Sequence, residues 1–92
     1  MLNYFFSKKY KKSFKKLKRS GRFNQEKVKQ VVYKLINGEL LDQKYEDHQL
    51  NGVFSEHREC HIESDLLLIY KISLQNNYLE LTDIGSHPNL FK

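Results

Sequence analysis

The chain has 92 residues, 39% of them hydrophobic, and its sixteen lysines and arginines outnumber eleven acidic residues for a net charge of +5. This length favours one domain with one thin core, so we expect a single domain over residues 1–92 and no separate cofactor-binding domain. The single cysteine, Cys60, excludes a disulfide framework and is typical of a reducing compartment. No apolar run approaches the ~18 residues of a membrane span, and the first residues lack the order of a signal peptide. We therefore expect a soluble cytoplasmic protein that does not bind a membrane.

The first third of the chain has the pattern of a short strand followed by two amphipathic helices. Residues 2–6 are rich in aromatic side chains and short enough to form a strand. Ser7 can cap a first helix, and Gly21 can end it. Asn24 can cap a second helix, which ends at Asn37. In both helices the apolar residues recur every three or four positions, which predicts an antiparallel helical hairpin with one buried stripe on each helix.

The second half of the chain has the pattern of an antiparallel sheet. After a polar stretch over residues 39–52, the hydrophobic period changes to two, which predicts strands over 53–62, 65–72 and 78–84. The middle segment is apolar throughout, so we expect it to be buried on both faces. The order β-α-α-β-β-β predicts an α+β fold in which the helical hairpin packs on an antiparallel sheet.

Charge is divided unevenly along the chain. Residues 1–34 hold twelve cations and one acidic residue, a net charge of +11, whereas residues 35–92 have a net charge of −6. Binding of a polyanion such as RNA is one interpretation of the basic third, and a solvated helix face is the other. If a polyanion binds there, we expect the contacts to come from Lys8, Lys11, Lys12 and Lys15.

All four histidines lie in the second half of the chain. His57 and His61 have the spacing of two metal ligands on a helix, but on a strand the same spacing separates them by roughly 13 Å. We therefore expect no metal and no cofactor. Cys60 adjoins His61, but neighbouring strand residues point to opposite faces, so the thiol belongs in the core. Proton transfer by histidine and carboxylate side chains is the chemistry that remains, with His48, His61, Asp65 and His87 as candidates.

Three segments in the second half carry recognisable motifs: YEDHQLNG over residues 45–52, RECHIESDLLLIY over 58–70 and GSHPNLF over 85–91. Their order and spacing resemble the YafQ branch of the RelE/ParE superfamily, the small toxins of bacterial toxin–antitoxin pairs. The resemblance implies a RelE-like fold and an endoribonuclease that enters the A site of the 30S ribosomal subunit and cuts the mRNA codon there without a metal. The implied partners are a cognate antitoxin, ribosomal RNA and mRNA.

The resemblance also implies roles for individual side chains. By motif, His87 is expected to be the general acid, and Asp65 together with His61 or His48 is expected to act on the base side. Which of these three is the base stays open. Phe91 is expected to stack on or position an RNA base, as aromatic side chains do on single strands.

Two positions depart from the family pattern. Asp83 stands where members commonly have an arginine that can bind the scissile phosphate, so we expect Arg58 or Lys71 to stabilise that charge instead. Leu66 stands where a tryptophan is common, which removes a stacking surface. These departures leave a second interpretation open, a non-catalytic RelE-fold module that binds RNA or an antitoxin. A third interpretation, a ParE-like protein that poisons gyrase, leaves the histidine motifs without a role.

Overall fold

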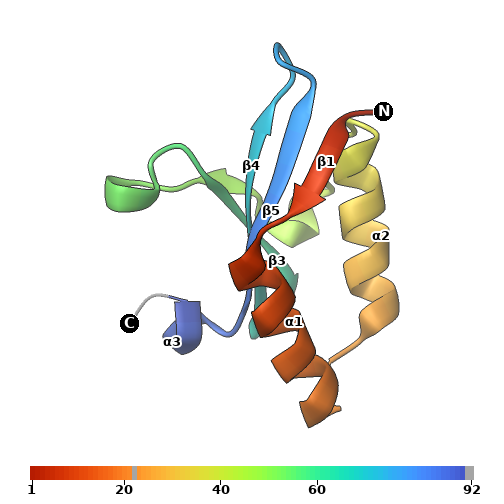
Figure 1. The fold of residues 1–92 in the computed structure, drawn as a ribbon, viewed down its shortest axis with the longest axis vertical. Coiled ribbons are helices and arrows are strands. Elements are labelled where there is room, and N and C mark those ends of the chain that lie inside the picture. Colours follow the sequence, from red (N-terminus) through yellow and green to blue (C-terminus); the bar gives the residue numbers. More distant parts are fainter. Residues whose placement is uncertain (22, 91–92) are drawn as a thin grey trace.

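The computed structural model describes residues 1–21 and 23–90 and has an α+β architecture, as predicted. Helices α1 and α2 form the predicted hairpin, and five strands form one sheet (Figure 1). In chain order, the elements are β1 (Asn3–Phe6), α1 (Lys8–Ser20), α2 (Gln25–Ile36), η1 (Gln43–Tyr45), β2 (His48–Gln49), η2 (Gly52–Phe54), β3 (Arg58–Glu63), β4 (Leu66–Ser73), β5 (Tyr78–Gly85) and α3 (His87–Leu90).

The sheet has the strand order β1-β5-β4-β3-β2. Strands β2 to β5 pair antiparallel, as the pattern of the second half predicts, whereas β1 pairs parallel to β5. The sheet is therefore mixed, and the one parallel pair joins the first strand of the chain to the last. A parallel pair requires a long connection, and here it consists of the helical hairpin and the rest of the sheet.

One face of the sheet carries the main hydrophobic core. The helical hairpin covers this face with the apolar stripe of α2, in which Val31 is completely buried. From the sheet, β4 contributes Leu68 and Tyr70, and β3 contributes Cys60, all at 1% exposure or less. The first five residues of β4 are buried, on both faces of the strand, which confirms the prediction for the central apolar segment.

The predicted helix ends are confirmed. The Ser7 hydroxyl accepts a hydrogen bond from the Tyr10 N–H, and Gly21 ends α1 in the left-handed conformation with φ of 65°. Asn24 caps α2 by accepting from the backbone N–H groups of Glu26 and Lys27. These caps satisfy backbone donors that a helix leaves without internal partners.

The segment before β3 differs from the prediction. The alternating pattern predicted a strand from residue 53, but the chain forms the short 3-10 helix η2 over Gly52–Phe54, and β3 begins only at Arg58. Gly52 has φ of 69°, in the left-handed region, and turns the chain out of the sheet. The structure also contains three other short elements that the sequence did not predict: the 3-10 helix η1, the edge strand β2 and the helix α3.

The other face of the sheet, which we call the open face, carries a smaller apolar cluster. It consists of Leu67 and Ile69 from β4, Leu90 from α3 and the half-buried Leu50 from the loop after β2. This cluster ties α3 and that loop to the sheet. No helix in the described part of the chain is both long and apolar enough to cross a membrane.

Candidate active site

Strand pairing brings several of the predicted residues to the open face. Directly paired residues in an antiparallel sheet point to the same face. One row of pairs across β2, β3, β4 and β5 therefore consists of His48, Glu59, Ile69 and Asp83. The next row, toward the end of the sheet, consists of His61, Leu67 and Gly85.

Two of the four predicted catalytic residues meet around a buried carboxylate. The Nε2 atom of His61 lies 3.2 Å from Oε1 of Glu59, and the Nε2 atom of His48 lies 3.6 Å from the same oxygen. The two imidazole rings are 6.4 Å apart between centroids, and the Glu59 side chain is only 7% exposed. We call these three residues the histidine cluster.

Hydrogen bonding constrains the protonation of the histidine cluster. The Nδ1 atom of His48 lies 2.8 Å from the carbonyl oxygen of Glu46, and because a carbonyl only accepts, Nδ1 carries the proton. His61 has a carboxylate near each ring nitrogen, Glu59 at Nε2 and the Glu46 side chain 3.7 Å from Nδ1. Only the 3.2 Å contact is a hydrogen bond, so a proton on Nε2 satisfies Glu59 and leaves Nδ1 able to accept a proton. One shared carboxylate therefore lies between two imidazoles that can hold and pass a proton.

Sequence reasoning missed Glu59. It lies two residues before His61 on the same strand, so the two side chains share a face, and that spacing is the signal that could have found it. A buried carboxylate requires hydrogen-bond donors or positive charges as partners, and the two histidines can provide them.

The other two predicted catalytic residues lie at the same end of the sheet as His61. Asp65 is in the exposed turn between β3 and β4 and makes no ion pair within the described part of the chain. His87 is the exposed first residue of α3, two positions after Gly85, which lies in the row of His61. The predicted aromatic contact, Phe91, lies outside the described residues.

Side chains along β3 point alternately to the two faces of the sheet. Arg58 therefore points to the core side with Cys60, whereas Glu59 and His61 point to the open face. Its Nε donates to Asp47 at 3.0 Å, and its Nη1 lies 3.4 Å from the side-chain oxygen of Gln49. The Tyr70 hydroxyl donates to the other oxygen of Asp47 at 2.7 Å. Burial, reinforced by Asp47, raises the pKa of Tyr70 well above its usual value, so the phenol stays a donor. The structure therefore ties Arg58 to Asp47 and does not bring it to the histidine cluster.

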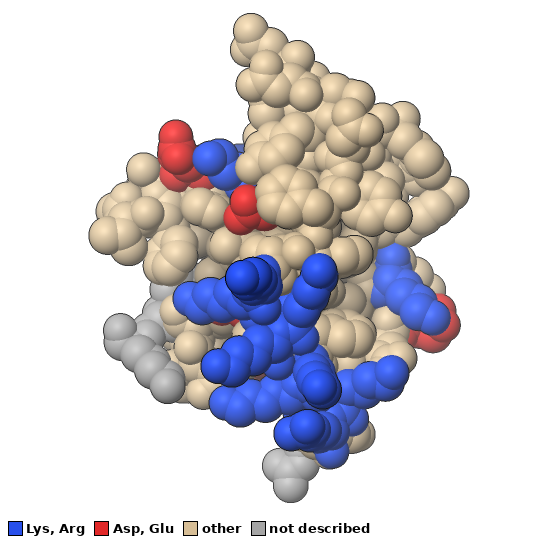
Figure 2. Space-filling model, in the orientation of Figure 1, with Lys and Arg blue, Asp and Glu red and all other residues tan. Residues whose placement is uncertain are grey.

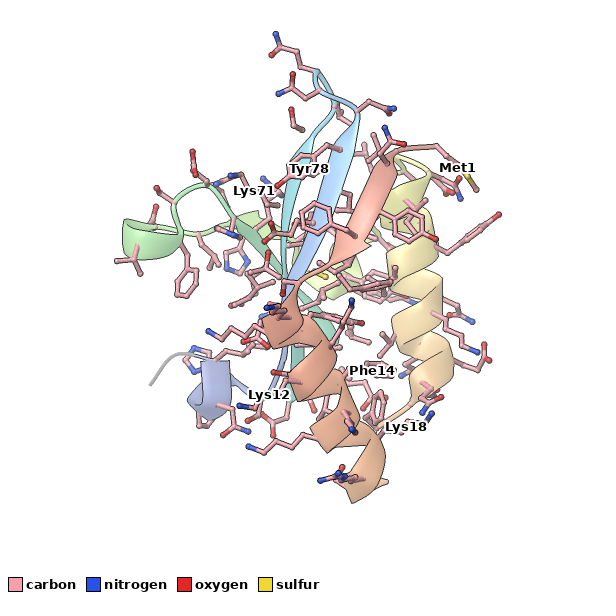
Figure 3. All side chains as sticks on the ribbon, in the orientation of Figure 1. Met1, Lys12, Phe14, Lys18, Lys71 and Tyr78 are labelled. Carbon is pink, nitrogen blue, oxygen red and sulfur yellow. The ribbon has the colours of Figure 1, made fainter. Side chains whose placement is uncertain are left out.

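Lys71 lies on the open face but is paired with an acid. Its Nζ lies 3.3 Å from Oε2 of Glu56, in the loop before β3, and this bond raises the pKa of the lysine. Figure 3 shows its side chain reaching from β4 toward that loop. The Lys71 ammonium is thus bound to Glu56. Lys71 also lies four residues along β4 from Leu67, which pairs with His61.

Asp83 is turned toward α1. It is 4% exposed, and its Oδ1 accepts hydrogen bonds from the Ser13 hydroxyl at 2.6 Å and from the Ile84 N–H at 2.8 Å. Its Oδ2 lies 3.6 Å from Nζ of Lys9. The carboxylate that departs from the family pattern therefore fastens α1 to β5, and a lysine partly neutralises it.

Lysines cover the outer surface of α1 (Figure 2). The four that we expected to contact a polyanion are all exposed, and none forms an ion pair with another described residue. Figure 3 shows Lys12 on the outside of α1 and Phe14 between the two helices. We call Lys8, Lys11, Lys12 and Lys15 the lysine surface.

Two concave regions flank α1. Between α1 and α2 lies an open groove of about 850 Å³ with the aromatic side chains of Phe6, Tyr10, Phe14 and Tyr33 in its lining. A second, which we call the α3 groove, has a volume of about 730 Å³ and lies on the open face. It is lined by Lys9, Leu50, Asn51, Gly52, Val53, Phe54, Asn89 and Leu90.

The remaining reactive side chains are placed differently. Cys60 is completely buried, and burial raises the pKa of its thiol far above its usual value, which makes it an inert core residue, as predicted. His57 precedes β3 and packs edge-on against Phe54. Among the described residues, no three histidine, cysteine or acidic side chains are arranged to hold a metal ion.

Residues 2–92 match the model of a protein family described as the bacterial toxin of type II toxin–antitoxin systems, YafQ. The chain is thus one of the small toxins of type II toxin–antitoxin systems. Within that class it belongs to the YafQ family, which confirms the resemblance carried by the three motifs.

Individual relatives agree with this assignment. The mRNA interferase toxin YafQ of Escherichia coli K12 is 38% identical over 66 residues, or 71% of this chain and 70% of the relative. A YafQ-type protein of Haemophilus influenzae is 39% identical over 51 residues, which is 55% of this chain and half of the relative.

Solved structures share the whole fold. A metal-bound toxin from Helicobacter pylori has a TM-score of 0.89 at 43% identity, covering 99% of this chain and all of that one. The structure of E. coli YafQ in its complex with DinJ has a TM-score of 0.87 at 29% identity, with both chains fully covered.

Proposed function

We propose that this protein is a ribosome-dependent mRNA endoribonuclease, the toxin of a type II toxin–antitoxin system. The observation that carries the proposal is the histidine cluster, in which two imidazoles share one buried carboxylate at 3.2 and 3.6 Å. The E. coli relative that is 38% identical is named an mRNA interferase, which supports the same activity here.

The proposed reaction uses the 2′-hydroxyl of the RNA as nucleophile. His48 or His61 removes the 2′-hydroxyl proton, the 2′-oxygen forms a bond to phosphorus, and the bond from phosphorus to the 5′-oxygen breaks. A second group then gives a proton to the leaving 5′-oxygen. The products are a 2′,3′-cyclic phosphate and a free 5′-hydroxyl, so every proton in the step can be carried by side chains and no metal is required.

His87 is the proposed general acid. It is exposed at the start of α3, at the end of the sheet where the row of His61 lies. Asp65, in the turn at that same end, is proposed to act on the base side with His48 and His61. Phe91 follows α3 directly in the sequence, and we propose that it positions an RNA base.

We propose that the lysine surface binds ribosomal RNA in the A site of the 30S subunit. The four lysines are exposed and unpaired among the described residues, so their charge is available to phosphates. Ribosomes and mRNA are the partners this requires, and both are found in the cytoplasm.

A cognate antitoxin is the remaining proposed partner, since the fold also occurs in the E. coli complex of YafQ with DinJ. The groove between α1 and α2 combines an aromatic lining with a rim of lysines, including Lys11, Lys15 and Lys18. This combination suits an amphipathic helix that has acidic residues on its polar side.

The direct test is in vitro translation followed by mapping of mRNA 5′ ends, with the wild type compared to His87→Ala. We expect discrete cuts with the wild type and a loss of about 10²- to 10⁴-fold in the cleavage rate for the variant, because a general acid contributes that much. His57→Gln is the matched control, since His57 lies against Phe54 and has no proposed role. A wild type that binds RNA in a salt-sensitive manner but leaves mRNA on translating ribosomes intact would establish the non-catalytic binding module instead.

A further inference from the structure

We propose that Lys9 binds the phosphate of the RNA strand that is cut, and that Asp83 holds the Lys9 ammonium in position for it. This inference rests on the proposed nuclease function and adds a substrate contact to it. When the 2′-oxygen attacks, negative charge develops on the oxygens bound to phosphorus, so a cation close to the histidine cluster lowers the barrier.

The two cations that the sequence suggested for this task are held elsewhere. The Arg58 guanidinium donates to Asp47 at 3.0 Å on the core side of β3. The Lys71 ammonium lies 3.3 Å from Glu56. Moving either one to the site would break an ion pair, so a cation already directed toward the open face is the better candidate.

Lys9 is such a cation. It lines the α3 groove together with the loop after β2 and the residues Asn89 and Leu90 of α3. Among the described residues that line this groove, Lys9 is the only charged one. Because 66% of its side chain is exposed, the ammonium can take up an anion without losing its contact with Asp83.

Asp83 places Lys9 in line with the histidine cluster. Asp83 belongs to the same cross-strand row as Glu59 and His48, with Ile69 between Asp83 and Glu59. Neighbouring strands lie about 4.8 Å apart, so Asp83 and Glu59 are separated by about 10 Å along the row. Leu50 and Leu90 pack with Ile69 between them, so an RNA strand that crosses these two leucines can contact Lys9 on one side and the histidine cluster on the other.

The hydrogen bonds of Asp83 make it suitable as a support. Ser13 and the Ile84 N–H fix one of its oxygens, which leaves the other, 3.6 Å away, to attract the ammonium of Lys9. An ammonium has three donors, so one can serve Asp83 while two remain for phosphate oxygens. Asp83 thereby acts as a positioning residue, and Lys9 is the group that touches the substrate.

The test measures ribosome binding and the cleavage step separately. Wild type, Lys9→Met, Lys9→Arg and Asp83→Asn are compared in single-turnover cleavage of ribosome-bound mRNA at saturating protein, and their ribosome affinities are measured in parallel. Lys16→Met is the matched control, because Lys16 is an exposed lysine seven residues along α1 that carries the same charge but does not line the α3 groove.

We expect Lys9→Met to slow single-turnover cleavage about 100-fold, the typical cost of losing one group that stabilises developing charge. Its ribosome affinity should match that of Lys16→Met, and Lys9→Arg should restore most of the rate. Asp83→Asn keeps the acceptor for Ser13 but loses its charge, and it should slow cleavage less than Lys9→Met does.

Three outcomes overturn the inference in different ways. If the wild type cleaves and Lys9→Met cleaves equally fast, the assignment of Lys9 fails while the nuclease function stands. Lys9→Met and Lys16→Met could also lose ribosome affinity equally and cleave at the same rate at saturating protein. Lys9 would then be part of the docking surface and not a substrate contact. If the wild type itself leaves the mRNA intact, the nuclease proposal fails and takes this inference with it.

Discussion

The outer surface of α1 and the open face of the sheet hold their charges in contrasting ways. The four residues of the lysine surface are exposed and have no acidic partner among the described residues. On the open face, Glu59 lies between two histidines and Lys71 is paired with Glu56. Unpaired exposed charge favours long-range attraction of a polyanion, whereas paired and partly buried charge favours fixed geometry. This contrast agrees with the proposal that the lysine surface docks on RNA while the histidine cluster of the sheet carries the proton transfers.

Neutralising the lysine surface is expected to have the largest effect, a loss of ribosome affinity. Changing Lys8, Lys11, Lys12 and Lys15 together to glutamine should lower ribosome affinity by about 100-fold at moderate salt and reduce the salt slope of binding by about three. Equilibrium binding over a range of salt concentrations measures both quantities. The saturated cleavage rate should stay unchanged, and a variant that keeps its affinity and salt slope would show that the lysines form only a solvated face.

A smaller effect is expected from the carboxylate shared by the histidines. Glu59→Gln removes the charge that both imidazoles face while keeping the shape of the side chain, so it should slow single-turnover cleavage about tenfold by loosening the geometry of the cluster. Ribosome affinity should remain that of the wild type. Equal rates for the variant and the wild type would mean that Glu59 does not position the histidines; a thermal melt of both proteins checks that the fold is intact.

The smallest effect is expected from the hydrogen bond between Ser13 of α1 and Asp83 of β5. Ser13→Ala removes the hydrogen bond from α1 to Asp83 and should lower the free energy of unfolding by about 1–2 kcal/mol, the usual contribution of a partly buried bond to a charged group. Denaturant titration measures it. Ser20→Ala, at the exposed end of the same helix, is the comparison variant, and an equal loss in both would contradict a specific role for the Ser13 bond.

Local structure was predictable where neighbouring residues determine it. The caps at Ser7 and Asn24 and the end of α1 at Gly21 depend on hydrogen bonds and backbone angles within a few residues, and all three were read from the sequence. The apolar run of β4 was likewise sufficient to predict burial on both faces.

Features that depend on distant partners were not predictable. Strand β2 has only two residues, His48 and Gln49, and forms because they pair with β3. The local sequence therefore has no pattern that predicts it. The role of Glu59 follows from that pairing, since it is β2 that brings His48 to the carboxylate.

The role of Asp83 was not predictable for the same reason, because its partners lie even farther away in the sequence. By sequence it was a carboxylate in an unfavourable place for phosphate binding. Its partners Ser13 and Lys9 are some seventy residues away, and only the packing of α1 against β5 reveals that the carboxylate supports a cation.

The parallel pairing of β1 with β5 has a consequence for synthesis. β1 lies beside residues 78–81, the Ser7 hydroxyl donates to the carbonyl of Thr82, and Ser13 reaches Asp83, so the beginning of the chain packs on its last strand. While the polypeptide is being translated, β1 and α1 lack their main packing partner until β5 has emerged. The cross-strand row from His48 to Asp83 is also complete only when β5 has paired with β4. The proposed active site would thus be complete only after β5 has been synthesised, in one late and cooperative folding step.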